Sequence, residues 1–328
     1  MNKILTIVIP SYNVEQFLEK TVDSFLADSI MDDIEILIVN DGSKDKTKEI
    51  GLSYEAKYPK CVKLVDKENG GHGSTINTGL SIASGKYFKV VDGDDWVDTD
   101  AFVSYVNKLK EIDVDMVLTP FNEVYVPSMR TVKRATANIA TNQQYSLSSV
   151  LKNIGDCYQM HSITFKTSLI KGKLKITEHC FYVDQEYILL PLKDVEFVMF
   201  LDETIYQYRL GDENQSVSVK SKQKNRQMHQ KVVMRLLENY EEIKSDLSDE
   251  KREFLKQRIV GLVYTQLDIY FSMGDVYNEF ENFWKEYKTV AADIYETMRG
   301  GTAKMLKVNK KLGYKVASKR LQKKLAAE

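Results

Sequence analysis

The stretch that decides the fold lies at the start of the chain, where residues 4–13 read Ile4-Leu5-Thr6-Ile7-Val8-Ile9-Pro10-Ser11-Tyr12-Asn13. The run of β-branched residues predicts a short buried strand, and Pro10 ends it because proline cannot donate to a sheet ladder. Apolar residues then recur at helical spacing from Phe17 to Leu26, with Asn13 as a candidate N-cap. A strand that leads through a polar turn into a helix is typical of α/β proteins.

The same unit repeats along the first hundred residues. Further apolar strands are predicted at 34–39, 62–65 and 87–91, each followed by a helical segment. This alternation predicts a mostly parallel sheet with helices on both faces. From about residue 222 onward the pattern is almost wholly helical. The predicted fold class is therefore α/β, followed by a helical C-terminal region.

Composition narrows the class of protein. The chain has 328 residues, which favours about two domains, and 43% hydrophobic with 28% charged residues is an ordinary globular balance. A net charge of −1 argues against a nucleic-acid partner. The cysteines, Cys61, Cys157 and Cys180, are too far apart to indicate a zinc site or a disulfide framework. Because neither a signal peptide nor a membrane span is evident, we expect a cytoplasmic protein, and attachment to the inner face of the plasma membrane stays open.

Polar clusters follow three of the predicted strands: residues 11–13, residues 40–42 and residues 92–95. Ligands of parallel sheets bind beyond the carboxyl ends of the strands. The cluster Asp92-Gly93-Asp94-Asp95 offers hard oxygen ligands of the kind that join Mg²⁺ or Mn²⁺ to a diphosphate. The alternative is a solvated turn that caps the next helix.

Two further segments could carry chemistry. Residues 69–73, Asn69-Gly70-Gly71-His72-Gly73, would let backbone N–H groups approach phosphates, although the spacing matches neither the Walker nor the dinucleotide motif. The alternative is a flexible loop in which His72 is solvated. Asp184-Gln185-Glu186 precedes an apolar helix, and it is either an acidic helix start or the position of a general base.

Four blocks together resemble the family 2 glycosyltransferases of the GT-A fold, in order and in spacing. The blocks are Ile7–Asn13, Ile38–Asp45, Asn69–Gly71 with Asn77 and Gly79, and Val91–Trp96. The resemblance is close over residues 4–100 and weaker to about 218. It implies a Rossmann-like sheet with a nucleotide-sugar-binding half at 1–100 and an acceptor-binding half at 101–220. A helical domain at 221–328 would follow.

The resemblance implies roles at the donor end. Tyr12 would pack against the nucleotide base and Pro10 would shape that strand end. Glu15 would lie near the nucleotide, and Asp41 would accept a hydrogen bond from a uracil ring, which indicates a UDP-sugar donor. The implied donor site also includes Gly70 and Asn77, from the third block. It is completed by a segment that would fold over the diphosphate, formed by Tyr206–Arg209 with residues 215–218, and this segment contributes Arg209.

The resemblance also implies the catalytic parts. Asp94 would hold Mn²⁺ or Mg²⁺, Asp92 would reach the ribose or the metal, and Asp95 is left open as a further ligand. Asp184 would be the base that activates an acceptor hydroxyl, with Glu186 as the runner-up, and the sugar would be transferred with inversion.

This chain departs from the family pattern at one block. Many relatives carry Ala-Arg where Thr75-Ile76 stands here, so any contact from that arginine is missing and His72 is a candidate substitute. The Gln-x-x-Arg-Trp pattern of processive synthases is absent, which favours a single addition to a saccharide or lipid-linked acceptor in bacterial cell-surface glycan assembly. The alternatives are a non-catalytic nucleotide-sugar-binding subunit and a sugar nucleotidyltransferase.

The tail is basic and amphipathic. Residues 304–324 hold nine lysines and arginines without an acid, and Met305, Val308, Leu312 and Val316 form an apolar stripe. Such a segment either contacts an anionic membrane or is a solvated helix whose stripe packs on the protein. The Tyr- and Phe-rich helices at 260–290 are expected to pack as core or as a homodimer surface.

Overall fold

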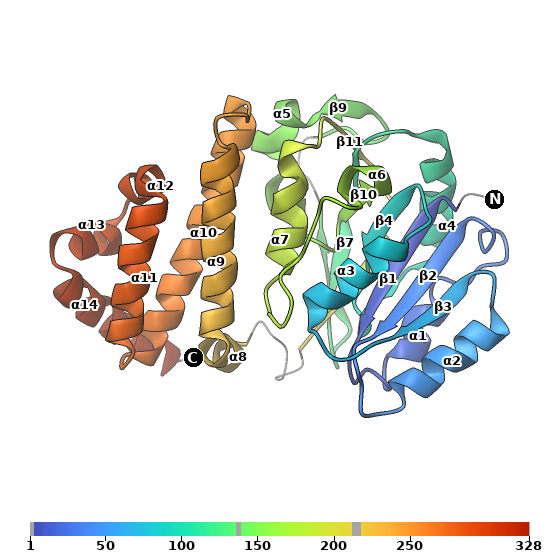
Figure 1. The fold of residues 1–328 in the computed structure, drawn as a ribbon, viewed down its shortest axis with the longest axis horizontal. Coiled ribbons are helices and arrows are strands. Elements are labelled where there is room, and N and C mark those ends of the chain that lie inside the picture. Colours follow the sequence, from blue (N-terminus) through green and yellow to red (C-terminus); the bar gives the residue numbers. More distant parts are fainter. Residues whose placement is uncertain (1–2, 136–138, 212–217, 328) are drawn as a thin grey trace. The chain divides into compact units, whose positions relative to one another are not determined.

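A computed structural model describes residues 3–135, 139–211 and 218–327 (Figure 1). The chain divides into two compact units, Met1–Asp212 and Glu213–Glu328. The finer division of the first unit into donor and acceptor halves near residue 100 stays a prediction.

An eight-stranded sheet forms the centre of the first unit, in the order β3-β2-β1-β4-β10-β6-β11-β9 (Figure 1). The first four strands in the chain are parallel to one another. Their bounds are Leu5–Ser11 for β1, Ile34–Asn40 for β2, Val62–Asp66 for β3 and Tyr87–Val90 for β4. The other strands are β6 (Met116–Leu118), β9 (Gln144–Ser146), β10 (Ile163–Lys166) and β11 (Phe197–Phe200). The predicted α/β fold class is confirmed.

The sheet is the core of this unit because its central strands are covered on both faces. Every residue of β1 is buried, including Leu5, Ile7 and Ile9 on one side and Val8 on the other. Burying each such side chain contributes about 1.5–3 kcal/mol, which is why these strands read as continuous apolar runs. The helices of this unit are α1 (Leu18–Asp23), α2 (Thr47–Lys57), α3 (His72–Ile82), α4 (Thr99–Glu111), α5 (Leu147–Val150), α6 (Thr167–Ile170) and α7 (Asp184–Leu189).

The predicted N-cap at Asn13 is wrong. Helix α1 begins at Leu18, with Phe17 in the cap position. Asn13 instead has a left-handed backbone with φ 55°, and its side-chain oxygen accepts a hydrogen bond from Lys44 N at 2.8 Å. The asparagine joins two loops because a short amide side chain tolerates this conformation and can bond to a neighbouring backbone.

A second, four-stranded sheet has the order β5-β12-β7-β8. Its strands are β5 (Trp96–Val97), β7 (Phe121–Tyr125), β8 (Arg130–Arg134) and β12 (Tyr206–Leu210). Strand β12 pairs antiparallel with β5, so that Gln207 lies opposite Trp96. This pairing carries the Tyr206–Arg209 segment to the residues that follow β4.

The second unit is helical. Its helices are α8 (Val219–Lys224), α9 (Arg226–Ile243), α10 (Asp249–Met273), α11 (Tyr277–Val290), α12 (Ala292–Thr297), α13 (Gly301–Val308) and α14 (Lys310–Leu325). Tyr270, Phe280, Phe283 and Trp284 are buried against one another, so the aromatic residues of α10 and α11 form a core. None of the helices in the described ranges has the length and apolarity to span a membrane.

Candidate active site

The acid turn after β4 is held close to the end of β1. Asp95 N donates to Asp92 O at 3.0 Å, which closes the turn, and Gly93 N donates to Pro10 O at 3.2 Å. A Cβ on Gly93 would lie 2.9 Å from Pro10 O, so this position has no room for a side chain. Strand β1 continues through Pro10, which lies opposite Val39, to Ser11, so the prediction that Pro10 ends the strand is wrong, and a donor contact of Pro10 stays a prediction.

Asp95 is the most deeply enclosed acid of the turn. It is 1% exposed, and its carboxylate accepts hydrogen bonds from Tyr206 Oη at 2.6 Å and from Arg209 N at 2.7 Å. Burial, with the charges of Asp94 and Asp92, raises the pKa of Asp95 well above its usual value. Strand β12 thus supplies the donors that keep this carboxyl group in place.

Asp92 is paired with a histidine from another element. His72 Nε2, at the start of α3, lies 2.8 Å from Asp92 Oδ1. Burial would raise the pKa of Asp92, but the charge of His72 and its hydrogen bond outweigh burial and lower that pKa. In the same way, burial would lower the pKa of His72, but Asp92, with smaller effects from Asp184 and Asp94, raises it. The charges of Asp92, Asp184 and Asp94 thus together favour the protonated form of His72.

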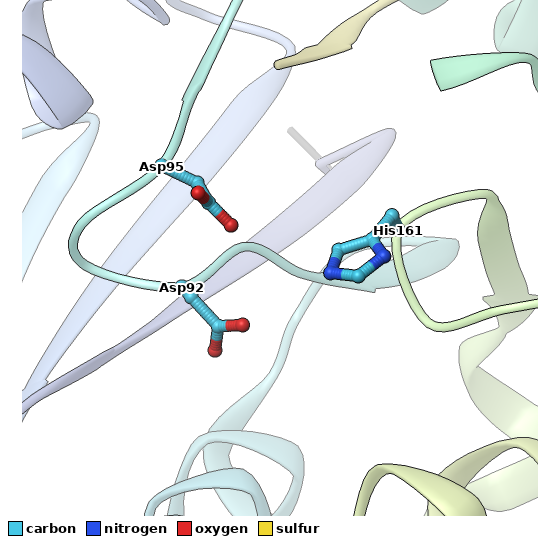
Figure 2. Close-up of side chains that lie close together, drawn as sticks. All are labelled: Asp92, Asp95 and His161. Carbon is cyan, nitrogen blue, oxygen red and sulfur yellow. The ribbon is translucent and has the colours of Figure 1, made fainter. Parts of the chain in front are cut away.

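His161, which precedes β10, lies close to the acid turn. Ligand atoms of Asp92, Asp95 and His161 all lie within 4.8 Å of one another, and Figure 2 shows the imidazole directed at the two carboxylates. The ring stacks on Tyr208 with centroids 4.1 Å apart, and burial lowers the pKa of His161 to about 4. A neutral imidazole is the form that binds a metal ion. The sequence analysis did not identify this residue.

Lys89 fixes the backbone that carries His161. Its Nζ donates to His161 O at 2.8 Å and to Ile163 O at 3.3 Å. The side chain is fully buried in β4, and burial lowers the pKa of Lys89 to about 7. The centre of the sheet therefore supports one side of the acid group.

Asp94, the predicted metal ligand, is half-buried at the tip of the turn. Burial, followed by the charge of Asp92, raises the pKa of Asp94 to about 6. Arg209 Nε donates to Asp94 O at 2.8 Å, and the guanidinium lies over the rings of Phe17 and Trp96 at 4.6 and 5.1 Å. The structure thus brings Arg209 to the acid turn, while residues 215–217 of the predicted diphosphate segment lie outside the described residues.

The two acids of α7 have different surroundings. Asp184 is half-buried at the start of the helix and accepts a hydrogen bond from Gln185 Nε2 at 2.8 Å. Burial, with a smaller effect of the Asp92 charge, raises the pKa of Asp184. Glu186 is fully buried and accepts hydrogen bonds from both Thr177 N and Thr177 Oγ1 at 2.7 Å. Asp184 therefore feels the charge of the acid turn, and Glu186 anchors a neighbouring segment.

The glycine loop is organised by Asp41. The Asp41 carboxylate accepts hydrogen bonds from Gly70 N at 2.9 Å and from Gly71 N at 2.7 Å, and Lys67 Nζ lies 2.8 Å from it. The Asp41 side chain is 3% exposed. These contacts fix the loop; the predicted bond from Asp41 to a uracil ring stays a prediction.

A segment that the sequence analysis did not identify closes over α3. Asn77 bonds both to Ile176 O at 2.9 Å and to Ile176 N at 2.8 Å. A Cβ on Gly73 would lie 2.2 Å from Thr177 O, so the backbone of residues 176–180 rests directly on the helix. We call these residues the clasp. Asn77 thus has a structural role here, and its predicted donor contact is untested.

The expected base platform lies at the end of β1. Tyr12 is 51% exposed, whereas the next residues are tied to the loop after β2. Glu15 Oε2 accepts a hydrogen bond from Lys46 N at 2.8 Å, and Glu15 N donates to Asp45 Oδ2 at 3.0 Å. An exposed ring on a fixed loop can pack against a flat ligand, and the role of Tyr12 at the nucleotide base stays a prediction.

Comparisons with known proteins identify the family of this chain. The family model described as glycosyl transferase family 2 matches residues 6–172. "Uncharacterized glycosyltransferase EpsJ" of Bacillus subtilis is 31% identical over 216 residues, which cover 64% of this chain and 62% of EpsJ. "Minor teichoic acid biosynthesis protein GgaB" of the same organism is 28% identical over 222 residues, covering 66% of this chain and 24% of GgaB. The matched part is thus less than two thirds of each relative.

Solved structures share the fold at low sequence identity. Staphylococcus aureus TarS 1-349 in complex with UDP-GlcNAc superposes with a TM-score of 0.66 at 15% identity, covering 98% of this chain and 92% of that one. The mannosyltransferase PcManGT of Pyrobaculum calidifontis, in complex with GDP-Man and Mn²⁺, gives 0.53 at 14% identity, covering 98% and 87%. These likenesses extend over both the sheet unit and the helical unit.

Proposed function

Because the chain belongs to glycosyl transferase family 2, we propose that it transfers a sugar from a UDP-sugar to a hydroxyl of a saccharide or lipid-linked acceptor, with inversion. The observation that carries the proposal is the acid group at the carboxyl end of β4, where Asp92, Asp95 and His161 converge and Asp184 lies within electrostatic reach. This edge of the sheet is where parallel α/β folds bind ligands.

The donor would occupy the ends of β1 and β2 and the glycine loop. Exposed Tyr12 offers its ring to the base, and Asp41 holds the loop at which a diphosphate would lie. Arg209 brings a positive charge to the acid turn, where its Nε donates to Asp94 O. TarS was solved with UDP-GlcNAc and PcManGT with GDP-Man, so the uridine preference rests on the predicted Asp41–uracil bond.

The acid group fits a divalent cation. Burial, together with the charges of the neighbouring carboxyl groups, raises the pKa of Asp94 and Asp95, and a cation between these groups would relieve that cost. Asp92, Asp94, Asp95 and neutral His161 would hold the ion. An imidazole ligand favours Mn²⁺ over Mg²⁺, which prefers oxygen. When bound, such an ion neutralises charge on the departing diphosphate.

Asp184 would act as the general base. Its raised pKa brings the carboxylate closer to the operating pH, at which a base works best. The acceptor hydroxyl gives its proton to Asp184 and forms the new bond to the anomeric carbon while the bond to the diphosphate oxygen breaks on the opposite face. Glu186 is less suited because it is fully buried and bonded to Thr177.

The acceptor class follows from relatives and from what the sequence lacks. GgaB is described as a minor teichoic acid biosynthesis protein, and no processive-synthase pattern is present in this chain. We therefore propose a single addition during assembly of a bacterial cell-surface glycan.

The donor class is tested first, by a thermal-shift panel of UDP, GDP, CMP and dTDP with and without Mn²⁺. A ligand of the native state raises the melting temperature by mass action. We expect a Mn²⁺-dependent shift with UDP that is lost in Asp94→Ala. A larger shift with GDP would replace the donor assignment, and no shift with any nucleotide would contradict the proposed function.

The base is tested by two substitutions on α7. Asp184→Asn should keep the UDP–Mn²⁺ shift and lower turnover by about 10²–10⁴-fold. Glu186→Gln removes a carboxylate two residues away and should lower the melting temperature while kcat stays close to that of the wild type. Equal losses of turnover in the two variants, or normal turnover in Asp184→Asn, would remove Asp184 from this role.

A further inference from the structure

The turn between α13 and α14 exposes aliphatic side chains. Val308, the last residue of α13, is 83% exposed, and Leu312 in the first turn of α14 is 53% exposed. Among the large hydrophobic residues that the structure describes, Val308 is the most exposed. We call residues 307–312 the tip; Figure 1 shows α13 and α14 meeting there.

The tip is left out of the packing that holds these helices. Tyr314 is buried and donates from its hydroxyl to Tyr270 O at 3.1 Å, which fixes α14 on α10. A Cβ on Gly313 would lie 2.9 Å from Leu306 N, so the glycine allows α13 and α14 to approach closely. The predicted apolar stripe is therefore divided. The inner face of α14 packs against α10 and α13, whereas Val308 and Leu312 stay exposed.

A row of positive charge lies beside the tip. Lys311, Lys315, Lys319 and Lys323 are exposed and spaced by four residues, which places them along one side of α14. Residues 301–327 contain no acid. Lys307 and Lys310 pair with Glu296 at 3.5 Å and Glu281 at 2.9 Å, but none of the four lysines of the row forms an ion pair with the residues that the structure describes.

The combination of exposed aliphatic residues and unpaired lysines selects the partner. A protein partner is disfavoured because protein–protein interfaces are depleted in lysine. A nucleic acid would bind the lysines through its phosphates, but it would leave Val308 and Leu312 exposed to water. An anionic bilayer uses both, because its surface charge attracts lysine while aliphatic side chains enter the headgroup layer. We propose that the tip and the lysine row dock on an anionic lipid bilayer.

In this arrangement Val308 and Leu312 enter the bilayer surface, and the lysine row lies along the lipid phosphates. The docking is independent of the proposed transfer reaction, because the acid group belongs to the first unit and the docking residues to the second. It would hold the chain beside lipid-linked molecules.

The test is co-sedimentation of the full chain with phosphatidylcholine vesicles, with and without phosphatidylglycerol, at low and high salt. We expect binding only to the anionic vesicles, weakened by salt because exposed charges are screened. The triple variant Lys311→Glu, Lys315→Glu, Lys319→Glu should bind about a hundredfold more weakly, at about fivefold for each lysine lost. Val308→Ser with Leu312→Ser should weaken binding by at least about tenfold.

A matched control separates this surface from net charge. Lys220→Glu, Lys224→Glu, Lys285→Glu makes the same charge change at exposed positions on α8 and α11 and should bind as the wild type does. All substitutions are at exposed positions, and circular dichroism melts confirm that the variants fold. Equal binding to neutral vesicles, no binding by the wild type, or equal losses in the two triple variants would overturn the proposal.

Discussion

Lys89 offers a sharp test of how the sheet supports the candidate site, through the substitution Lys89→Met. The ammonium is fully buried and donates to the carbonyl oxygens of His161 and Ile163, and burial lowers its pKa to about 7. In an unfolded chain a lysine titrates near pH 10.4. The folded state therefore binds fewer protons than the unfolded state between pH 7 and about 10.

The sign and size of the effect follow from that difference. Because the unfolded state holds the extra proton, the free energy of unfolding of the wild type rises with pH through this window. With one pKa unit worth about 1.4 kcal/mol, Lys89 contributes a rise of roughly 2 kcal/mol between pH 7 and pH 9. Below pH 7 both states are protonated and the dependence due to this group fades.

The assay is urea unfolding of the wild type and of Lys89→Met at pH 7, 8 and 9. The stability of the wild type relative to the variant should increase by about 2 kcal/mol over that range, whatever the offset at pH 7. Lys86→Met, which removes a partly exposed ammonium paired with Asp113 at 3.4 Å, gives the baseline for losing a lysine beside the same strand. Parallel pH dependences of the wild type and Lys89→Met would refute the reasoning.

Three other substitutions test parts of the site. Tyr206→Phe removes a hydrogen bond to buried Asp95 and should cost about 1.5–3 kcal/mol in urea unfolding; a cost below 0.5 kcal/mol would show that the hydroxyl does not support the carboxylate. Gly73→Ala places a methyl group on Thr177 O and should lower the melting temperature and displace the clasp, which a crystal structure with unmoved backbone would contradict. His161→Ala should weaken Mn²⁺ binding in calorimetry by at least about tenfold; unchanged Mn²⁺ affinity would exclude His161 as a ligand.

The four parallel strands of the sheet were predicted well because each is marked by a pattern within its own short stretch of sequence. Residues 4–9, 34–39, 62–65 and 87–91 are short apolar runs, and all but Ile4 and Val91 lie in the four parallel strands. Buried parallel strands need apolar residues on both faces, so the pattern is continuous and easy to locate. The acid turn was found for the same reason, since it follows directly from the last of these runs.

The parts that the sequence did not reveal depend on distant pairing. Strand β10 runs antiparallel between β4 and β6, which no local pattern announces. His161 precedes that strand as a lone histidine, and only the sheet order carries it to Asp92. Asn77 meets Ile176 across 99 positions of the chain. Such contacts are determined by the tertiary fold, so residue spacing alone could not identify them.

The clasp also has a consequence for synthesis of the chain. Domains form from the N-terminus as residues emerge, yet contacts between distant positions wait for both partners. A nascent chain that ends at residue 172 contains all of the region matched by the family model but neither the clasp nor Asp184. In such a chain the backbone of the clasp is missing from its place against α3 at Gly73. The clasp and the proposed base therefore become available together, once residues 176–186 have been added to the chain.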